Sequence, residues 1–238
     1  MSDRSRDHDA DQGTGGRSGV WPGQGPPQQP ESGIPEFGAR RLLYIGSGAL
    51  SAAHLPFWVN WLRAACPDLE LRVLLTRSAE RFVAPGALAA LSGREVVQDV
   101  WPQGPVVHAP HVELAEWADA VVVHPASFHF MSRLALGVAD TPAMLALQCT
   151  RVPVALAPSL PPGALESPAY RSHHAALSAR DNVIVVPPVR GVSTTTGRAD
   201  AALAAPLPEV LRALEALRGG TLSGTGTGNG PGAPAGTA

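Results

Sequence analysis

Apolar residues occur along the chain in short runs that alternate with longer segments of helical spacing. The short runs are rich in Val, Ile and Leu and have the length of strands that are buried on both faces. They predict strands at 41–45, 71–75, 117–123, 154–157 and 183–186, the third of these with its apolar core at 120–123. Helical spacing predicts helices at 49–65, 79–91, 128–138, 167–179 and 207–217. This alternation predicts an α/β fold, a parallel sheet with helices on both faces in a three-layer sandwich.

The two ends of the chain differ in composition from the middle. Residues 1–38 mix Gly, Pro, Gln, Ser and charged residues without periodicity, and residues 219–238 form a Gly/Thr/Pro tract. Such compositions bury too little apolar surface to offset the entropy of the chain. We therefore expect disordered tails at both ends and one folded domain at 39–218. With 238 residues, of which 45% are hydrophobic, the chain can bury one substantial core.

Charge and cysteine content exclude several classes of protein. The formal net charge is -2, every basic side chain is Arg and no basic block occurs, so we expect no nucleic-acid partner. Cys66 and Cys149 do not form a C-x-x-C motif, so neither a disulfide framework nor a metal site is indicated. The sequence shows neither an apolar signal core nor an apolar stretch of membrane-spanning length, and we expect a cytoplasmic protein.

The first predicted strand ends in a turn of small residues, Gly46-Ser47-Gly48-Ala49-Leu50-Ser51, which leads into a helix. Backbone N–H groups at such a turn can bind an anion, and a phosphate fits there. Ser51 stands where a dinucleotide fingerprint has its third glycine. The second strand runs into Thr76-Arg77-Ser78 instead of an acidic residue, which favours a mononucleotide over a nicotinamide dinucleotide. The alternative is an ordinary turn in which Thr76 or Ser78 caps a helix.

The segment 111–140 joins a histidine, a buried strand, a Pro-Ala-Ser turn and a helix. We expect Pro125 to stop the strand. Ser127 and His129 then fall in a turn at the carboxyl end of a parallel strand, where open α/β sheets bind ligands. The segment therefore indicates an active site.

Four motifs in this segment carry a resemblance to a known family. They are His111-Val-Glu-Leu, Trp117-Ala-Asp, Pro125-Ala-Ser and Gly137-Val-Ala-Asp. With residues 40–217 as a whole, they resemble the homo-oligomeric flavin-containing cysteine decarboxylases. The resemblance implies a Rossmann-like (flavodoxin-like) fold and FMN as cofactor. Within the family, the chain is most similar to the branch that oxidatively decarboxylates the C-terminal cysteine of ribosomally synthesised precursor peptides, giving an enethiol for aminovinyl-cysteine crosslinks.

The resemblance also implies roles for individual residues. His111 matches the histidine that acts as the active-site base, although a lone histidine is more often structural. The residues expected to bind FMN follow the three turns: Gly46, Ser47, Gly48, Ser51, Thr76, Ser78, Phe82, Pro125, Ala126, Ser127, His129 and Asp140. The residues expected to bind substrate are Ser159, Leu160 and Arg171.

The sequence departs from the family pattern at three places. His129 stands where the family has Asn, and the flanking Phe128 and Phe130 either pack on the flavin or fill the core. Pro161 replaces the Asn that holds the substrate carboxylate, a role left to Ser159, the backbone after Gly163, or an arginine such as Arg171 or Arg190. The segment 191–198 lacks the cysteine of the coenzyme A branch, which argues against phosphopantothenoylcysteine as substrate and for an enethiol product.

The resemblance implies a homo-oligomer, a trimer or a dodecamer of trimers, that acts on a precursor peptide with a C-terminal cysteine and has no membrane partner. Three alternatives remain open from the sequence. They are a non-catalytic flavoprotein, a partner subunit of a peptide-modifying complex, and a flavin prenyltransferase.

Overall fold

The structure is a computed structural model that describes the backbone of residues 36–224 and the side chains of residues 36–220. The expected tails at 1–35 and 225–238 lie outside the described residues. The central sheet has six strands in the order β3-β2-β1-β4-β5-β6, and every pair is parallel. The strands are β1 (Arg41–Gly46), β2 (Glu70–Leu75), β3 (Val97–Gln98), β4 (Ala120–Ser127), β5 (Val154–Ser159) and β6 (Val183–Val185). The predicted Rossmann-like parallel sheet is confirmed.

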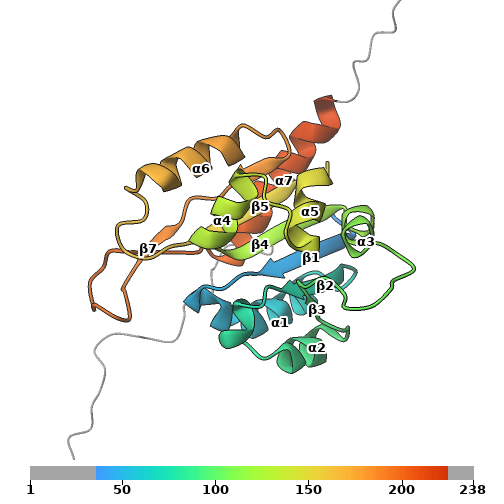
Figure 1. The fold of residues 1–238 in the computed structure, drawn as a ribbon. Helices are drawn as coiled ribbons and strands as arrows, with labels where there is room; N and C mark the ends of the chain where they lie inside the picture. The colour runs from blue at the N-terminus through green and yellow to red at the C-terminus, as the bar shows by residue number, and fades with distance from the viewer. Residues whose placement is uncertain (1–35, 225–238) are drawn as a thin grey trace, which may run out of the picture. The chain divides into compact units, whose positions relative to one another are not determined.

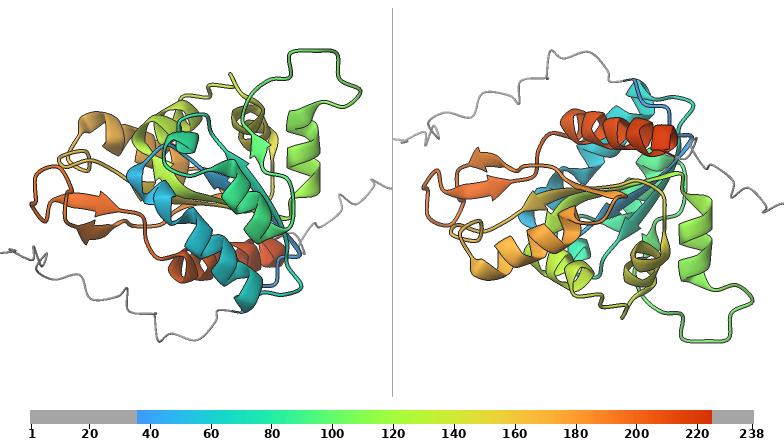
Figure 2. Two further views of the ribbon diagram at one scale, coloured as in Figure 1. Left: turned by 90° about the horizontal axis from the view of Figure 1, so that it is seen from below. Right: turned by 90° about the horizontal axis from the view of Figure 1, so that it is seen from above.

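Two apolar clusters cover the two faces of this sheet. Along β1, Leu42 and Tyr44 belong to one cluster and Leu43 and Ile45 to the other, as expected when successive side chains of a strand alternate between faces. The first cluster contains residues of α1 (Leu55–Ala65), α2 (Pro85–Ser92) and α7 (Leu207–Gly224). The second contains residues of α3 (Pro110–Trp117), α4 (Phe128–Ala135), α5 (Pro142–Cys149) and α6 (Pro168–Ser178). The domain therefore has three layers (Figures 1 and 2).

Prolines and glycines set helix boundaries that the periodicity alone did not give. The helix expected at 49–65 is divided into a 3-10 turn, η1 (Leu50–His54), and α1, which has a proline in its first turn. The helix expected at 79–91 is likewise divided into η2 (Ala79–Arg81) and α2, which begins at Pro85. The helix expected at 128–138 ends at Ala135, and Gly137 follows with a φ of 72°.

The strand β4 differs from its prediction at both ends. Trp117 is the last residue of α3, so the strand begins only at Ala120. The expectation that Pro125 stops the strand was wrong, because β4 continues to Ser127. Its pairing with β5 shifts register between Val123 and Ala126, and this irregularity accommodates a residue that has no N–H to donate. The Pro-Ala-Ser segment is therefore part of the sheet.

Several short elements were not anticipated from the sequence. They are α3, α5, β3 and an antiparallel hairpin of β7 (Val189–Gly191) and β8 (Ala201–Leu203). Both missed helices begin with proline, and the hydroxyl of Thr141 caps α5 by accepting from the N–H of Met144. The segment 191–198, which lacks the cysteine of the coenzyme A branch, begins at the end of β7, and residues 192–200 connect the two hairpin strands. A Cβ on Gly191 would lie 2.2 Å from the side chain of Leu203, so glycine allows the hairpin to close.

The last helix, α7, continues to Gly224, beyond the expected domain boundary at residue 218. Among the described residues, none of the helices has the length and apolar character needed to cross a membrane.

A buried histidine lies in the middle of the core. His124, on β4, has its Nδ1 at 2.9 Å from the hydroxyl of Tyr44 and its Nε2 at 3.0 Å from the carbonyl oxygen of Ala205. A carbonyl only accepts, so Nε2 carries the hydrogen and Nδ1 accepts from Tyr44. Burial lowers the pKa of His124 to about 4, since water cannot solvate the charged ring. His124 is thus a neutral residue of the core.

We expect His124 to make the fold less stable in acid. Above pH 6.5 the ring is neutral in both the folded and the unfolded chain. Between pH 6.5 and about 4 the unfolded chain binds a proton that the folded chain excludes, so the free energy of unfolding falls as the pH falls, by up to about 3 kcal/mol. Urea unfolding of wild type and His124→Gln from pH 4 to pH 7 measures this, because the variant cannot titrate. Equal pH dependence in both proteins would contradict it.

Candidate active site

The hydroxyl of Ser47 joins the turn after β1 to the carboxyl end of β4. Ser47 Oγ donates to the carbonyl oxygen of Pro125 at 2.7 Å and accepts from the N–H of Ser127 at 2.8 Å. The backbone N–H of Ser47 donates to the same Pro125 oxygen at 3.2 Å. Ser127 in turn caps α4, since its hydroxyl accepts from the N–H of Phe130 at 3.2 Å. Two of the turns expected to bind the cofactor are therefore one hydrogen-bonded unit.

The turn after β2 packs directly against the turn after β1. A Cβ placed on Gly48 would lie 2.3 Å from Ser78 Oγ, and one on Gly46 would lie 2.5 Å from Leu55 and 2.9 Å from Leu75. Both glycines thus permit close packing within the protein, independently of any ligand. Ser78 Oγ lies 3.2 Å from Thr76 Oγ1, and neither hydroxyl caps η2, so the capping alternative is not supported.

The third link runs from η1 to β5. The hydroxyls of Ser51 and Ser159 lie 3.0 Å apart. Ser51 belongs with Ser47, Gly48, Thr76 and Ser78 to a serine group, which collects hydroxyl and amide groups after β1 and β2, and Ser159 joins it from the end of β5. The Gly48 N–H donates to no acceptor within the described part of the chain. Hydroxyls and free amides at the start of a helix are donors that suit a phosphate.

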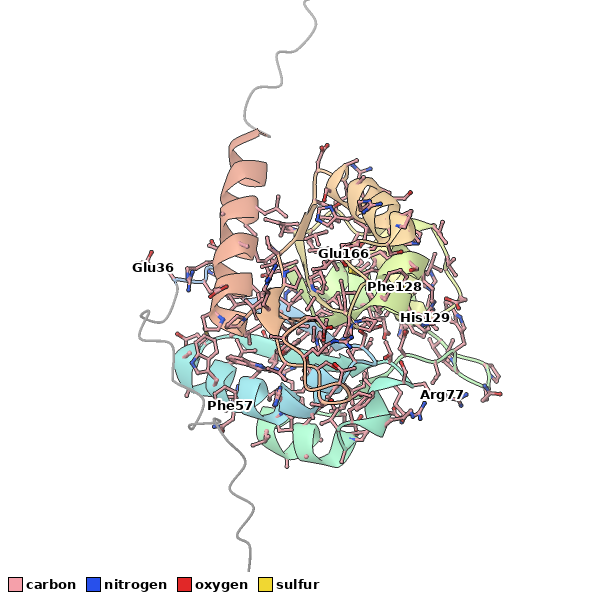
Figure 3. The ribbon with its side chains drawn as sticks, turned by 90° about the vertical axis from the view of Figure 1, so that its left-hand side faces the viewer. Glu36, Phe57, Arg77, Phe128, His129 and Glu166 are labelled. Atoms are coloured by element: carbon pink, nitrogen blue, oxygen red, sulfur yellow. The ribbon has the colours of Figure 1, made fainter. Side chains whose placement is uncertain are left out.

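Aromatic residues border this group. Phe82 follows η2 and is partly exposed, and Pro125 and Ala126 are buried in β4. Figure 3 shows the exposed His129 and its neighbour Phe128 between Arg77, which follows β2, and Glu166, which follows β5. The Phe128 ring contacts those of Tyr170 and His173 on α6 at centroid distances of 6.2 and 6.3 Å. Phe130 is buried, so core filling is its role, whereas Phe128 lies at the rim.

His111 lies in the first turn of α3. Its ring contacts the indole of Trp101 edge to face, with centroids 5.8 Å apart and planes at 70°. Its Nδ1 is buried and has no hydrogen-bond partner among the described residues. Since buried polar atoms are normally paired, this nitrogen is exceptional among the described side chains. No hydrogen bond joins His111 to the serine group around Ser47 within residues 36–220.

Asp140 was expected to contact the cofactor, and the structure gives it two protein partners. Its carboxylate forms an ion pair with Arg133 of α4, and its carbonyl oxygen accepts from the indole N–H of Trp101 at 2.7 Å. Its role toward a cofactor stays a prediction. Sequence reasoning missed Trp101 and Arg133, since neither belongs to a motif.

A cavity of about 350 Å³ lies between the loop after β5 and the β7–β8 hairpin. Pro161, Gly163, Glu166 and Arg190 are among the residues that line it. Arg171 is exposed on α6 and is not one of them. Leu160 is buried in the second cluster, and its backbone pairs with Ala202, so its side chain packs in the core. The three residues expected to bind substrate are therefore not brought together. Of the three, Ser159 alone is hydrogen-bonded to the serine group, through Ser51.

No group of three or more His, Cys, Asp or Glu residues in the described chain is arranged to hold a metal ion.

Residues 35–216 match the family model described as flavoprotein. This stretch includes nearly all of the described domain, and the chain belongs to the flavoprotein family. The match confirms the family that the motifs indicated.

Several relatives define the chain's place more closely. The chain is 34% identical over 185 residues to the cypemycin cysteine dehydrogenase (decarboxylating) of a Streptomyces species, and the alignment covers 78% of this chain and 95% of that protein. The crystal structure of the cypemycin decarboxylase CypD has a TM-score of 0.66 and 29% identity, covering 79% of this chain and 98% of that one. The FMN-dependent cysteine decarboxylase TvaF from thioviridamide biosynthesis has a TM-score of 0.60 and 30% identity, with coverage of 75% and 98%.

We expect Ser47→Ala to destabilise the domain. The change removes the acceptor of the Ser127 N–H and the donor to Pro125, and both groups are buried. Leaving a buried polar group unpaired costs about 1–3 kcal/mol, which urea unfolding measures. Ser51→Ala is the matched control, because its hydroxyl bonds only the partly exposed Ser159. Equal losses in the two variants would contradict a special role for Ser47.

Proposed function

We propose that the chain is an FMN-dependent decarboxylase that acts on the C-terminal cysteine of a ribosomally synthesised precursor peptide and yields an enethiol. The observation that carries this proposal is the likeness to a cysteine dehydrogenase (decarboxylating) over 95% of that protein's length. The likeness to two solved cysteine decarboxylases over almost their whole chains supports it. An enethiol of this kind serves aminovinyl-cysteine type crosslinks.

The residues at the carboxyl ends of the strands fit FMN. Ser51, Thr76 and Ser78 supply hydroxyls and Gly48 supplies a free N–H, which suits the phosphate. Pro125, Ala126 and Ser127 form a rigid, hydrogen-bonded edge beside them. Phe82, His129 and Asp140 complete the proposed contacts with the cofactor.

The chemistry that bound FMN supplies is two-electron oxidation of the cysteine between sulfur and β-carbon, after which carbon dioxide leaves the α-carbon and an enethiol forms. His111 is the proposed catalytic residue. The Nδ1 of its ring, which is buried and has no partner among the described residues, is the atom proposed to hold or move a proton. The edge-to-face contact with Trp101 keeps that ring from rotating freely.

The substrate end of the site lies beyond β5. Ser159 faces the serine group, and the cavity lined by Gly163 and Arg190 lies next along the chain. Arg190 is the better placed of the two arginines considered for the carboxylate, since Arg171 lies outside the cavity. The loop and hairpin that enclose the cavity contain no cysteine, so no protein thiol there can reduce the product, and this supports an enethiol as the end point.

The proposed assembly is a homo-oligomer, a trimer or a dodecamer of trimers. Exposed valines lie along the segment from β3 to α3. They are Val100, Val106, Val107 and Val112, of which Val107 is 92% exposed. Apolar side chains gathered on one surface segment are typical of a protein interface. The segment adjoins His111, so a subunit contact here would cover the site.

The proposed reaction is tested with purified protein, FMN and synthetic peptides that end in cysteine. We expect the product mass to fall by one carbon dioxide and two hydrogen atoms, and a serine-terminated peptide to stay unchanged. His111→Asn should lower the rate roughly 10²- to 10⁴-fold, because a positioned proton-transfer group contributes that much. Its flavin content should stay that of wild type. No loss of mass with a range of cysteine-terminated peptides would contradict the function, and an active His111→Asn variant would contradict the role of His111 alone.

The proposed assembly predicts the mass of the protein in solution. One chain has a mass of 24.6 kDa, and we expect light scattering to give a multiple of three chains. Val107→Asp, which places a charge on the exposed valine surface, should lower that mass, whereas Arg151→Asp, on the exposed start of the loop after α5, should not. A wild-type mass of one chain would contradict the assembly.

A further inference from the structure

A chain of contacts leads from Asp99, the residue after β3, to His111. Asp99 follows β3 directly and is only 3% exposed. Its carboxylate accepts from the N–H of Ala143 at 2.9 Å and from the hydroxyl of Thr141 at 2.8 Å. Both partners lie at the start of α5, so the carboxylate fixes the beginning of this helix against the sheet.

Asp140, which precedes the N-cap residue Thr141 of α5, connects this anchor to α4 and to Trp101. Arg133 pairs with the Asp140 carboxylate, and its guanidinium also donates to the Thr141 hydroxyl at 3.3 Å. The Asp140 carbonyl oxygen is thereby held at a fixed place, where it accepts the Trp101 indole N–H at 2.7 Å. The same bond ties the loop that carries Trp101 to the residue before the N-cap of α5.

Trp101 is an unusual residue for its position. It lies in an exposed loop and is itself 36% exposed. Its large ring therefore contributes less hydrophobic stabilisation than it would in the core. Its two specific contacts are the bond to Asp140 and the edge-to-face contact with the His111 ring. Such aromatic contacts have a preferred geometry and favour one orientation of each ring.

We propose that Trp101 is a positioning residue that fixes the imidazole of His111 for proton transfer, braced by Asp140, Arg133 and Asp99. This inference rests on the proposed function, in which His111 moves the proton. A misplacement of about 1 Å in a reacting group can cost roughly 10²-fold in rate. Trp101 acts through His111 and needs no contact with the substrate.

The test compares Trp101→Leu with Trp101→Phe and uses Trp117→Leu as a matched control. Trp117 is the last residue of α3, the helix that carries His111. The Arg72 guanidinium lies 4.4 Å from the centroid of its ring. We expect Trp101→Leu to lower kcat roughly 10- to 100-fold at unchanged KM and flavin content. Trp101→Phe, which keeps a ring but loses the bond to Asp140, should recover part of the loss. Trp117→Leu should keep kcat.

A second readout needs no activity. In the NMR spectrum of the full chain, the Cε1–H signal of His111, assigned by its absence in His111→Asn, should carry a ring-current shift that Trp101→Leu abolishes. Trp101→Phe should retain part of that shift, and light scattering should give the same mass for all variants.

Four results would overturn the proposal: kcat of Trp101→Leu within about twofold of wild type, Trp101→Phe no better than Trp101→Leu, a loss of kcat that follows the loss of flavin or of assembly mass, or an unmoved His111 signal. A wild-type protein that fails to decarboxylate any peptide overturns the proposed function instead, and the NMR readout still decides whether Trp101 fixes His111.

Discussion

The hydrogen bonds of one small side chain, Ser47, hold the candidate site together. The carboxyl ends of β1 and β4 are neighbours in the sheet, but the register shift in β4 leaves backbone groups there without ladder partners. Ser47 Oγ serves one of these groups as donor and another as acceptor. A hydroxyl can do both at once, whereas an amide nitrogen or a carboxylate cannot. The turn proposed to bind the phosphate and the segment proposed to border the flavin are thus fixed relative to each other by the protein's own hydrogen bonds.

The sequence predicted the parts of the fold that depend on burial. The five strands with long apolar runs are buried on both faces, and burial of this kind leaves a signal in composition alone. The missed elements are short or depend on partners distant in the chain. β3 has two residues and is defined by its pairing with β2, and the β7–β8 hairpin depends on Gly191 meeting Leu203. The helices α3 and α5 both begin with a proline, which is a signal for the start of a helix. The prediction relied on apolar periodicity and did not use this signal.

The candidate site divides in the same way. The small residues of the turns were predicted because few residue types suit such turns. The structure explains Gly46 and Gly48 by close packing against Leu55 and Ser78, and not by a bound phosphate. The bracing residues could not be found. Asp99 and Trp101 lie in the loop after β3 and Arg133 lies on α4, and nothing in the spacing between the loop and the helix shows that they meet. Their association follows from the strand order, which places β3 at one edge and lets α5 reach it across the second layer.

Two histidines of the domain differ in their surroundings. His124 lies between Tyr44 and Ala205, both of its nitrogens are paired, and burial lowers its pKa to about 4, so the ring stays neutral at physiological pH. His111 lies at the start of a helix, and one of its nitrogens is covered and has no partner within residues 36–220. Burial of Asp99 raises the pKa of its carboxyl, yet two hydrogen bonds and the nearby Arg133 oppose this and favour the carboxylate. The proposed brace behind His111 thus begins at a buried carboxyl group that is held by two hydrogen bonds.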